Sequence, residues 1–369
     1  MTSTSTSLLN QFTSGIFSTL NLDSDSTFPG VIDNYSHLPV LPGLDIPFDK
    51  YIGKNVLYIE NSLSFLFNLI DQDVFFIVDK NAHDMLTTFS GNSFKSDKLI
   101  LSDNLTSKSA IDSLITSIRN SPFFVAFGTG FLQDICKFVQ HVTQIPCLLI
   151  PTALSTHVFA SNFIHAHSVL HDFGLTTSLK SSSPFISILC ADLLAVAHHR
   201  YPRLLHSGIA DVYALRTATI EWQFGSQYQS SPDHKIAVIL SNKTIELLLS
   251  SYQNSNTLDF VLSQVLLNVI TDVVGSPPAS GTEHLYANII EKYHSYTDLH
   301  GELVAKGITL QTSILDIFPK QAIFSEMMTL NIFPNSPLVF DNIDDIILSQ
   351  MFELSQLKKR FTILSLANT

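Results

Sequence analysis

Between residues 54 and 151, short apolar runs alternate with longer stretches in which apolar residues recur every three or four positions. The longer stretches have the spacing of helices, as Ile111, Leu114 and Ile118 illustrate. The short runs have the length and composition of buried strands, and they read NVLYI, VFFIV, KLILS, FFVAF and PCLLIP. Strands and helices that alternate in this way predict a doubly wound parallel sheet.

The pattern changes after the segment SPFISILCADLL, which ends at residue 194. Helical periodicity then replaces the strand-like runs, in the segments 202–224, 234–253, 257–274 and 280–308. We therefore expect a chain of the α/β class. An N-terminal parallel-sheet domain at residues 51–182 would be followed by an all-helical C-terminal domain at residues 183–369.

The first 50 residues differ from the rest of the chain. They open with MTSTSTS and contain several glycines and prolines around one short apolar patch, LLNQFTSGIF. We interpret them as an N-terminal extension. Because the first 49 residues contain no Lys or Arg, they lack the basic start of a secretory signal and the Arg content of a transit peptide. A cytoplasmic protein is the expectation.

Composition excludes several functional classes. Hydrophobic residues make up 45% and charged residues 14%, but no apolar run approaches the roughly 18–20 residues of a membrane span. The net charge of −12 disfavours nucleic acid and anionic membranes as partners. The low charge also suggests buried subunit contacts and hence a homo-oligomer. Three scattered cysteines with apolar neighbours predict buried thiols rather than a disulfide framework: Cys136, Cys147 and Cys190.

A glycine pair follows the apolar run FFVAF and precedes a helical stretch. In that position Gly128, Thr129 and Gly130 would let the backbone approach a phosphate at a helix N-terminus. A tight turn without a ligand is an equally good interpretation of this spacing. Asp79, which ends the run VFFIV, would bind a ribose hydroxyl of NAD or else cap a helix.

Hydroxyl-bearing residues follow the run PCLLIP. Thr152, Ser155, Thr156 and His157 would lie at the carboxyl edge of the sheet, where ligands of open α/β sheets bind. They would serve a nucleotide, a phosphate or only a helix cap.

Five motifs occur in an order that is informative. They are FGTGFLQDICKF, IPTALST, ADLLAVAHHRYPRLLHSGIADVYALRTATIEW, SGTEHLYANII and LHGELVAKGI. Over residues 50–310 the chain resembles the superfamily of dehydroquinate synthase, glycerol dehydrogenase, iron-dependent alcohol dehydrogenases and glycerol-1-phosphate dehydrogenase. The branch it resembles most is glycerol-1-phosphate dehydrogenase, on the patterns Arg203-Leu204-Leu205, Ser207 to Asp211, and Trp222.

The resemblance implies a divalent metal, zinc or iron, bound by one carboxylate and two histidines. Matched by motif, these residues are Asp211, His284 and His300. Such a set leaves coordination positions free, as a catalytic metal site requires. Without the resemblance, lone histidines on amphipathic helices would more often be polar residues of the helix packing.

The chain departs from the superfamily pattern at two positions. A glycine triplet is replaced by Gly128-Thr129-Gly130, so the threonine side chain must point away from a pyrophosphate. His157 stands where related patterns have an aspartate. A histidine there would act as a general base or proton shuttle, or else indicate an altered substrate or lost activity.

The resemblance implies an NAD(P)-dependent, metal-containing dehydrogenase, like glycerol-1-phosphate dehydrogenase, acting on a small polyol or polyol phosphate. Asp134 and Lys137 match an Asp-x-x-Lys pattern that lies near the nicotinamide or only fixes its helix, and Asp79 favours NAD over NADP. Arg203 would hold a structural carboxylate or face a substrate phosphate. The alternatives are a sugar phosphate cyclase of the dehydroquinate synthase type and a non-catalytic relative that only binds ligand.

Overall fold

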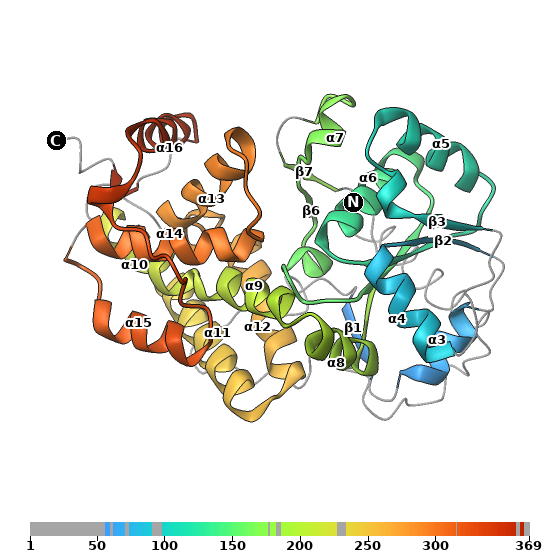
Figure 1. Cartoon of the computed structure of the whole chain (residues 1–369), viewed down its shortest axis with the longest axis horizontal. Coiled ribbons are helices and arrows are strands. Elements are labelled where there is room, and N and C mark those ends of the chain that lie inside the picture. The colour runs from blue at the N-terminus through green and yellow to red at the C-terminus, as the bar shows by residue number, and fades with distance from the viewer. Residues whose placement is uncertain are drawn as a thin grey trace. The chain divides into compact units, whose positions relative to one another are not determined.

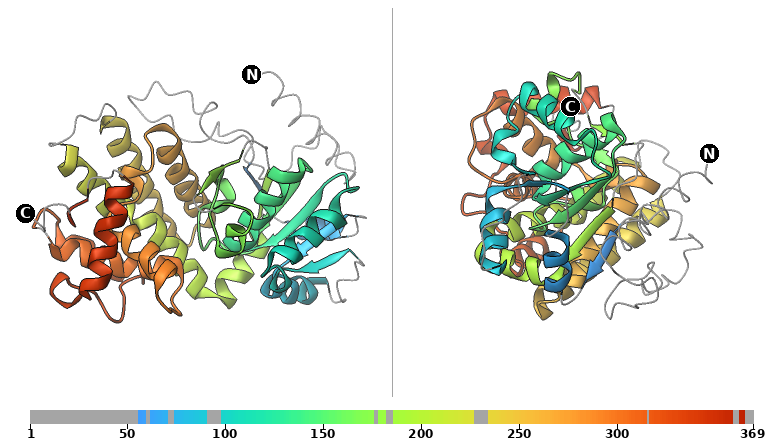
Figure 2. Two further views of the ribbon diagram at one scale, coloured as in Figure 1. Left: turned by 90° about the horizontal axis from the view of Figure 1, so that it is seen from above. Right: turned by 90° about the vertical axis from the view of Figure 1, so that its right-hand side faces the viewer.

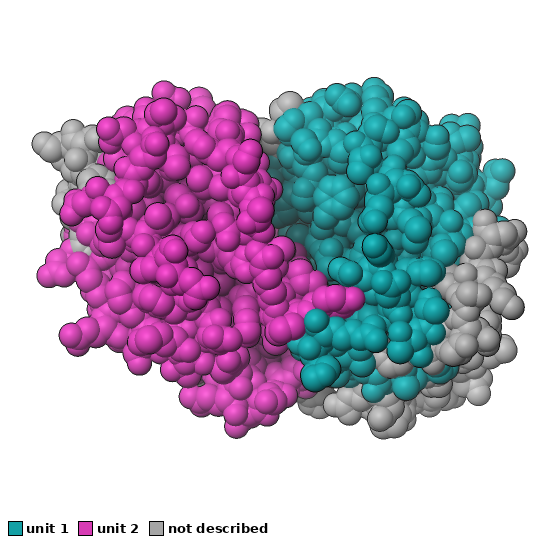
Figure 3. Space-filling view, in the orientation of Figure 1, with its two compact units in different colours: residues 1–39, 53–154, 158–200 teal, residues 40–52, 155–157, 201–369 magenta. Residues whose placement is uncertain are grey.

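The computed structural model describes residues 56–59, 62–70, 74–90, 98–175, 178–181, 186–226, 234–314, 316–358 and 362–364. The expected N-terminal extension, residues 1–50, lies outside this part of the chain. The described residues form two compact units, coloured separately in Figure 3. Unit 1 comprises those within 53–154 and 158–200, and unit 2 comprises 155–157 and those within 201–369.

Unit 1 is built on a six-stranded parallel sheet with the strand order β1-β8-β5-β4-β2-β3. Every neighbouring pair of strands in it is parallel, which confirms the predicted doubly wound architecture. The strands are β1 (Val56–Ile59), β2 (Phe75–Val78), β3 (Leu99–Leu101), β4 (Phe124–Gly128), β5 (Cys147–Pro151) and β8 (Ile186–Cys190).

Helices cover both faces of this sheet (Figures 1 and 2). On one face, α5 and α6 supply Ile111, Leu114 and Ile135 to a buried core with Phe124 and Leu149 of the strands. Helices α4 and α8 lie on the other face. The helices of unit 1 are α3 (Leu63–Ile70), α4 (Lys80–Ser90), α5 (Lys108–Ile118), α6 (Gly130–Thr143), α7 (Ser168–His171) and α8 (Ala191–Arg200). A short antiparallel pair, β6 (Phe163–Ile164) with β7 (Leu179–Lys180), completes the unit.

The strand order reverses between β2 and β4. The chain runs from β2 outward to β3 and then returns across β2 to β4. Ligands of doubly wound sheets bind at such a reversal, beyond the carboxyl ends of the strands. Asp79 follows β2 directly and Gly128 ends β4, so two of the predicted cofactor residues lie at this point.

The described residues of unit 2 form helices joined by connecting segments and no strand, as the periodicity predicted. Its helices are α9 (Pro202–Tyr213), α10 (Leu215–Ser226), α11 (His234–Asn254), α12 (Thr257–Val273), α13 (Thr282–Tyr293), α14 (His300–Ile314), α15 (Lys320–Thr329) and α16 (Asp345–Leu357). Strand β8 pairs with β1 and β5, so unit 1 runs to residue 200, beyond the domain boundary expected after residue 182.

Helix α14 packs closely against two other helices because two of its residues have no side chain. A Cβ atom at Gly301 would overlap the carbonyl of Ser207 on α9, and one at Gly307 would overlap the carbonyl of Glu283 on α13. The amide of Gly301 also donates to Ser207 Oγ at 3.0 Å. The two glycines therefore bring α9, α13 and α14 together around the beginning of α14.

Two further expectations from composition can be compared with the structure. Cys136, Cys147 and Cys190 are all buried and unpaired, as predicted. Among the described residues, the helices lack the combination of length and apolar character that crossing a membrane requires.

Candidate metal centre

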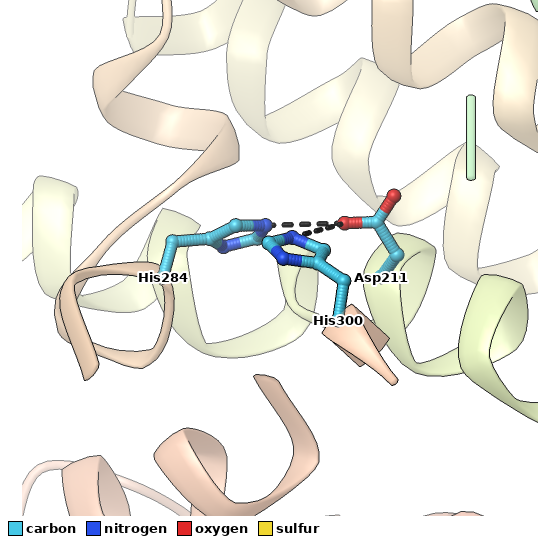
Figure 4. Close-up of side chains that lie close together, drawn as sticks. All are labelled: Asp211, His284 and His300. Atoms are coloured by element: carbon cyan, nitrogen blue, oxygen red, sulfur yellow. Dashed lines mark hydrogen bonds and ion pairs between the residues drawn. The ribbon is translucent and has the colours of Figure 1, made fainter. Parts of the chain in front are cut away.

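Three polar side chains from three different helices converge in unit 2. Asp211 comes from α9, His284 from the first turn of α13, and His300 is the first residue of α14. One ligand atom from each lies within 4.8 Å of the other two (Figure 4). The convergence expected from the motifs is therefore present, while the role of these residues as metal ligands remains a prediction.

The contacts are directed at one carboxylate oxygen. His284 Nε2 lies 3.1 Å and His300 Nε2 lies 3.8 Å from Asp211 Oδ1. Both imidazoles thus turn the same nitrogen toward the carboxylate, as Figure 4 shows. A carboxylate oxygen and two imidazole nitrogens facing one point form a donor set that zinc and iron(II) accept.

The other ring nitrogen of each of these two histidines, Nδ1, contacts a second carboxylate. Glu283 Oε1 lies 2.9 Å from His284 Nδ1, and Glu291 Oε1 lies 2.9 Å from His300 Nδ1. Because a carboxylate only accepts hydrogen bonds, each Nδ1 donates to its glutamate, and Nε2 is the nitrogen that a metal would bind by displacing a proton. These two glutamates were not predicted, although Glu283 directly precedes His284 in the sequence.

The beginning of α13 is fixed by a buried residue of α10. Gly281 precedes the helix and has no side chain that could cap it. The carboxylate of Glu221 caps the helix instead, because it accepts hydrogen bonds from Thr282 N at 2.8 Å and from Thr282 Oγ1 at 2.5 Å. Burial and the neighbouring Glu283 raise the pKa of Glu221 to about 7. This network sets where the first turn of α13, and with it His284, begins.

The charges at the convergence favour a cation. Asp211 is only 2% exposed, and within the described residues its ion-pair partners are histidines and not lysine or arginine. Burial opposes its charge, but His157, His284 and His300 lower the pKa of Asp211 well below its usual value. Burial likewise opposes the charge of His284, but the carboxylates of Asp211 and Glu283 raise its pKa to about 9. The residues therefore fit a bound divalent metal.

His157 approaches the same carboxylate from the other side. Its Nδ1 lies 2.9 Å from Asp211 Oδ2, the oxygen that the other two histidines do not face. The carbonyl of His157 accepts a hydrogen bond from Asn268 Nδ2 at 3.1 Å, which ties this segment to α12. The residue that departs from the superfamily pattern thus contacts the candidate metal centre directly.

The predicted cofactor residues of unit 1 also lie together. Asp79 Oδ1 accepts from Ala82 N at 2.7 Å, so Asp79 caps α4, and its Oδ2 accepts from Thr129 N at 2.9 Å. Burial raises the pKa of Asp79. One carboxylate therefore joins the ends of β2 and β4 at the reversal of strand order, and the helix-cap interpretation describes its contacts in this structure.

The remaining candidates follow β4 and β5. Gly130 begins α6, whose preceding residue Thr129 makes no side-chain capping bond. The amide of Thr152 donates to the carbonyl of Gly128 at 3.2 Å, which joins the two loops in unit 1. Ser155 and Thr156 belong to unit 2.

Asp134 and Lys137 are buried inside unit 1. Lys137 Nζ lies 3.2 Å from Asp134 Oδ1 and donates to the carbonyls of Val158, Ser161 and Phe163. The other carboxylate oxygen, Asp134 Oδ2, lies 3.0 Å from His167 Nε2. No spacing in the sequence indicated this histidine. The contacts favour the interpretation that the pair fixes α6 and the segment 158–163.

Arg203 is more than half exposed. It forms a bidentate ion pair with Glu302, in which Nε donates to Oε1 at 2.5 Å and Nη2 donates to Oε2 at 2.6 Å. It also donates to the carbonyl of Thr297. Its guanidinium therefore holds a structural carboxylate, the first of the two alternatives.

Comparison with known proteins agrees with this architecture. Residues 61–197 match the family described as iron-containing alcohol dehydrogenase. A curated relative, glycerol-1-phosphate dehydrogenase [NAD(P)+] of Methanococcoides burtonii, is 27% identical over 51% of this chain and 53% of its own length. The chain thus spans about half the length of the first curated relatives it matches.

Solved structures show the same fold. A probable glycerol dehydrogenase from Sinorhizobium meliloti superimposes with a TM-score of 0.59 at 17% identity, over 81% of this chain and 88% of that one. The 2-epi-5-epi-valiolone synthase ValA from Streptomyces hygroscopicus, with NAD+ and Zn2+ bound, gives a TM-score of 0.56 at 12% identity, over 82% and 86%. The resemblance inferred from the five motifs is confirmed.

Proposed function

We propose that this protein is a metal-dependent NAD(P)(H) oxidoreductase that reduces dihydroxyacetone phosphate to glycerol 1-phosphate. The observation that carries the proposal is the convergence of Asp211, His284 and His300, in a chain similar to proteins named glycerol-1-phosphate dehydrogenase. In the reaction the carbonyl carbon gains a hydride and the carbonyl oxygen gains a proton, while NAD(P)H becomes NAD(P)+.

Asp211, His284 and His300 would hold the metal, for which we propose zinc or iron(II). A divalent cation bound there supplies Lewis acidity to the substrate oxygen. The three side chains provide three ligand atoms and so leave a position for that oxygen. Glu283 and Glu291 keep the two imidazoles in the orientation that metal binding needs.

The dinucleotide would bind at the reversal of strand order in unit 1 and would supply the hydride. The carboxylate of Asp79 at this point disfavours the 2′-phosphate of NADP, so we propose NAD as the preferred form. The residues proposed for binding are Asp79, Gly128, Thr129, Gly130, Thr152, Ser155 and Thr156.

His157 would move the proton. Its Nδ1 is engaged by Asp211, which leaves Nε2 as the atom that holds or gives the proton. We assign Asp134 and Lys137 a positioning role, because their charged groups face each other and the backbone of 158–163.

The proposal is tested by assay of the purified protein with dihydroxyacetone phosphate and either NADH or NADPH. Loss of reduced-nucleotide absorbance that stops after chelation and returns with zinc or iron(II) supports it. Glycerol and the two glycerol phosphates, assayed in the reverse direction, define the substrate. Release of inorganic phosphate without net redox would instead identify a sugar phosphate cyclase, and metal binding without turnover would identify a non-catalytic relative.

We also propose a cytoplasmic homo-oligomer. Three buried free thiols and several exposed large apolar side chains, such as Met328 and Leu357, support these two parts of the proposal. Light scattering coupled to gel filtration measures the mass in solution, and a monomer would contradict the oligomer.

A further inference from the structure

The two oxygens of Asp211 have different surroundings. Oδ1 faces the Nε2 atoms of His284 and His300, whereas Oδ2 faces Nδ1 of His157. The only described group of ligand atoms within 4.8 Å of one another comprises Asp211, His284 and His300, and His157 is not part of it. The two oxygens therefore differ in role: Oδ1 is placed to bind a metal, and Oδ2 is placed to accept a hydrogen bond.

The direction of the bond to Oδ2 follows from the chemistry of the two groups. A carboxylate oxygen has no proton to give, so Nδ1 of His157 must be the donor. Nε2, on the opposite side of the ring, takes no part in this bond. Donation at 2.9 Å to a side chain that is 2% exposed is a charge-assisted hydrogen bond in surroundings with little competing water.

Hydrogen bonds within unit 2 hold the backbone around His157, so the position from which its imidazole extends is fixed. Asn268 Nδ2 donates to the carbonyl of His157 at 3.1 Å and to the carbonyl of Gln264 at 3.0 Å. Ser207 Oγ, one helical turn before Asp211, approaches the carbonyl of Ser155 at 3.4 Å. Both α9 and α12 therefore locate the segment that carries the ring.

We propose that His157 is a positioning residue that holds Asp211 as a one-oxygen metal ligand. By occupying Oδ2 it fixes the rotation of the carboxylate, keeps Oδ1 directed between the two imidazoles, and prevents both oxygens from chelating the metal. The coordination position that a chelating carboxylate would fill stays open for the substrate oxygen. This inference rests on the proposed metal site. The aspartate that the superfamily has at this position could not take the same role, because an ionised carboxylate has no proton to donate to Asp211.

The test compares zinc affinity, measured by chelator competition, in the wild type and three variants. His157→Ala removes the donor, and we expect the affinity to fall about 10–100-fold, as is typical when an outer partner of a ligand is lost. His157→Asn keeps an N–H at the place of Nδ1 and should restore the affinity to within about threefold of the wild type. His167→Ala removes an imidazole from Asp134, a matched histidine–carboxylate pair in unit 1, and should leave zinc affinity unchanged.

X-ray absorption of the zinc-loaded proteins gives a second readout. We expect two imidazole ligands in the wild type and still two in His157→Ala. Three imidazoles in the wild type would make His157 a ligand and overturn the proposal, as would an unchanged zinc affinity in His157→Ala. Absence of zinc binding in the wild type would instead contradict the proposed function. If His157→Ala does not fold, the asparagine variant decides, since a loss of affinity there as large as 10-fold contradicts the hydrogen-bond role.

Discussion

Two aspartates, Asp134 in unit 1 and Asp211 in unit 2, are both almost fully buried, and each contacts an imidazole. Asp134 also has a lysine, whose Nζ lies 3.2 Å from its carboxylate. Among the described residues, Asp211 has three histidines and no lysine or arginine as ion-pair partner.

The difference indicates what each carboxylate is for. A buried charge is costly unless it is paired, and the chain itself pairs Asp134 with Lys137. An imidazole binds a metal once it releases a proton, so His284 and His300 are available as metal ligands. Asp134 therefore belongs to a closed structural network, whereas Asp211 belongs to a site that a cation would complete.

The largest effect is expected from Asp211→Asn, which weakens the only anionic ligand. We expect metal content to fall from one equivalent to near zero and turnover to fall below detection, because the loss of a direct ligand exceeds the roughly 10–100-fold cost of losing an outer partner. Elemental analysis after gel filtration measures the metal. A variant that retains one tightly bound equivalent would contradict the assignment.

The matched change in unit 1, Asp134→Asn, should have the opposite profile. It leaves the ammonium of Lys137 buried without a counter-charge, and we expect a loss of about 3–5 kcal/mol in the free energy of unfolding with metal content retained. Denaturant unfolding measures the first quantity and elemental analysis the second. Loss of metal without loss of stability would reverse the comparison.

The pH dependence sharpens this prediction. Burial opposes the charge of Asp134, but Lys137 and His167 lower its pKa below the usual value. A carboxylate with a lowered pKa in the folded state contributes stability above its unfolded pKa of about 3.9, and this contribution is lost as the pH falls toward the folded value. The difference in stability between wild type and Asp134→Asn should therefore shrink below about pH 4, and a constant difference would contradict the ion pair.

A smaller effect is expected where α14 meets α9. In Gly301→Ala the new methyl would overlap the carbonyl of Ser207, so the helix must shift, at a cost of about 1–3 kcal/mol in unfolding free energy. Because His300 precedes this glycine, zinc affinity should fall as well. Unchanged stability and affinity would show that the close approach does not position the histidine.

The smallest effect is expected from Arg203→Ala. Its pair with Glu302 is largely exposed, and such pairs contribute about 0–1 kcal/mol. We expect metal content and the KM for dihydroxyacetone phosphate to stay unchanged in steady-state assays. A large rise in KM would show that Arg203 binds the substrate phosphate after all.

Much of the fold was predictable from periodicity. Apolar runs bounded by amphipathic stretches identified β1 to β5 and helices such as α5 and α6, because a parallel sheet covered on both faces makes its strands almost wholly apolar. Helix α4, between β2 and β3, was not predicted. The place where the sheet ends was harder to predict. Strand β8 lies next to β1 and β5 although it is distant from both in sequence, and no local pattern reports such pairing.

The candidate site was predictable only through motifs. Asp211, His284 and His300 lie on three helices, and local spacing says nothing about how those helices meet. The packing glycines Gly301 and Gly307 explain the meeting, but their effect depends on backbones that are distant in sequence. The bonds from His167 to Asp134 and from His300 to Glu291 escaped prediction for the same reason.

The most direct test of the metal site is a crystal structure of the zinc-loaded protein with anomalous scattering recorded at the zinc edge. We predict one strong peak at about 2.0–2.2 Å from a carboxylate oxygen of Asp211 and from the Nε2 atoms of His284 and His300. A peak bound by other residues, or none between these three side chains in protein that retains zinc, would contradict the account.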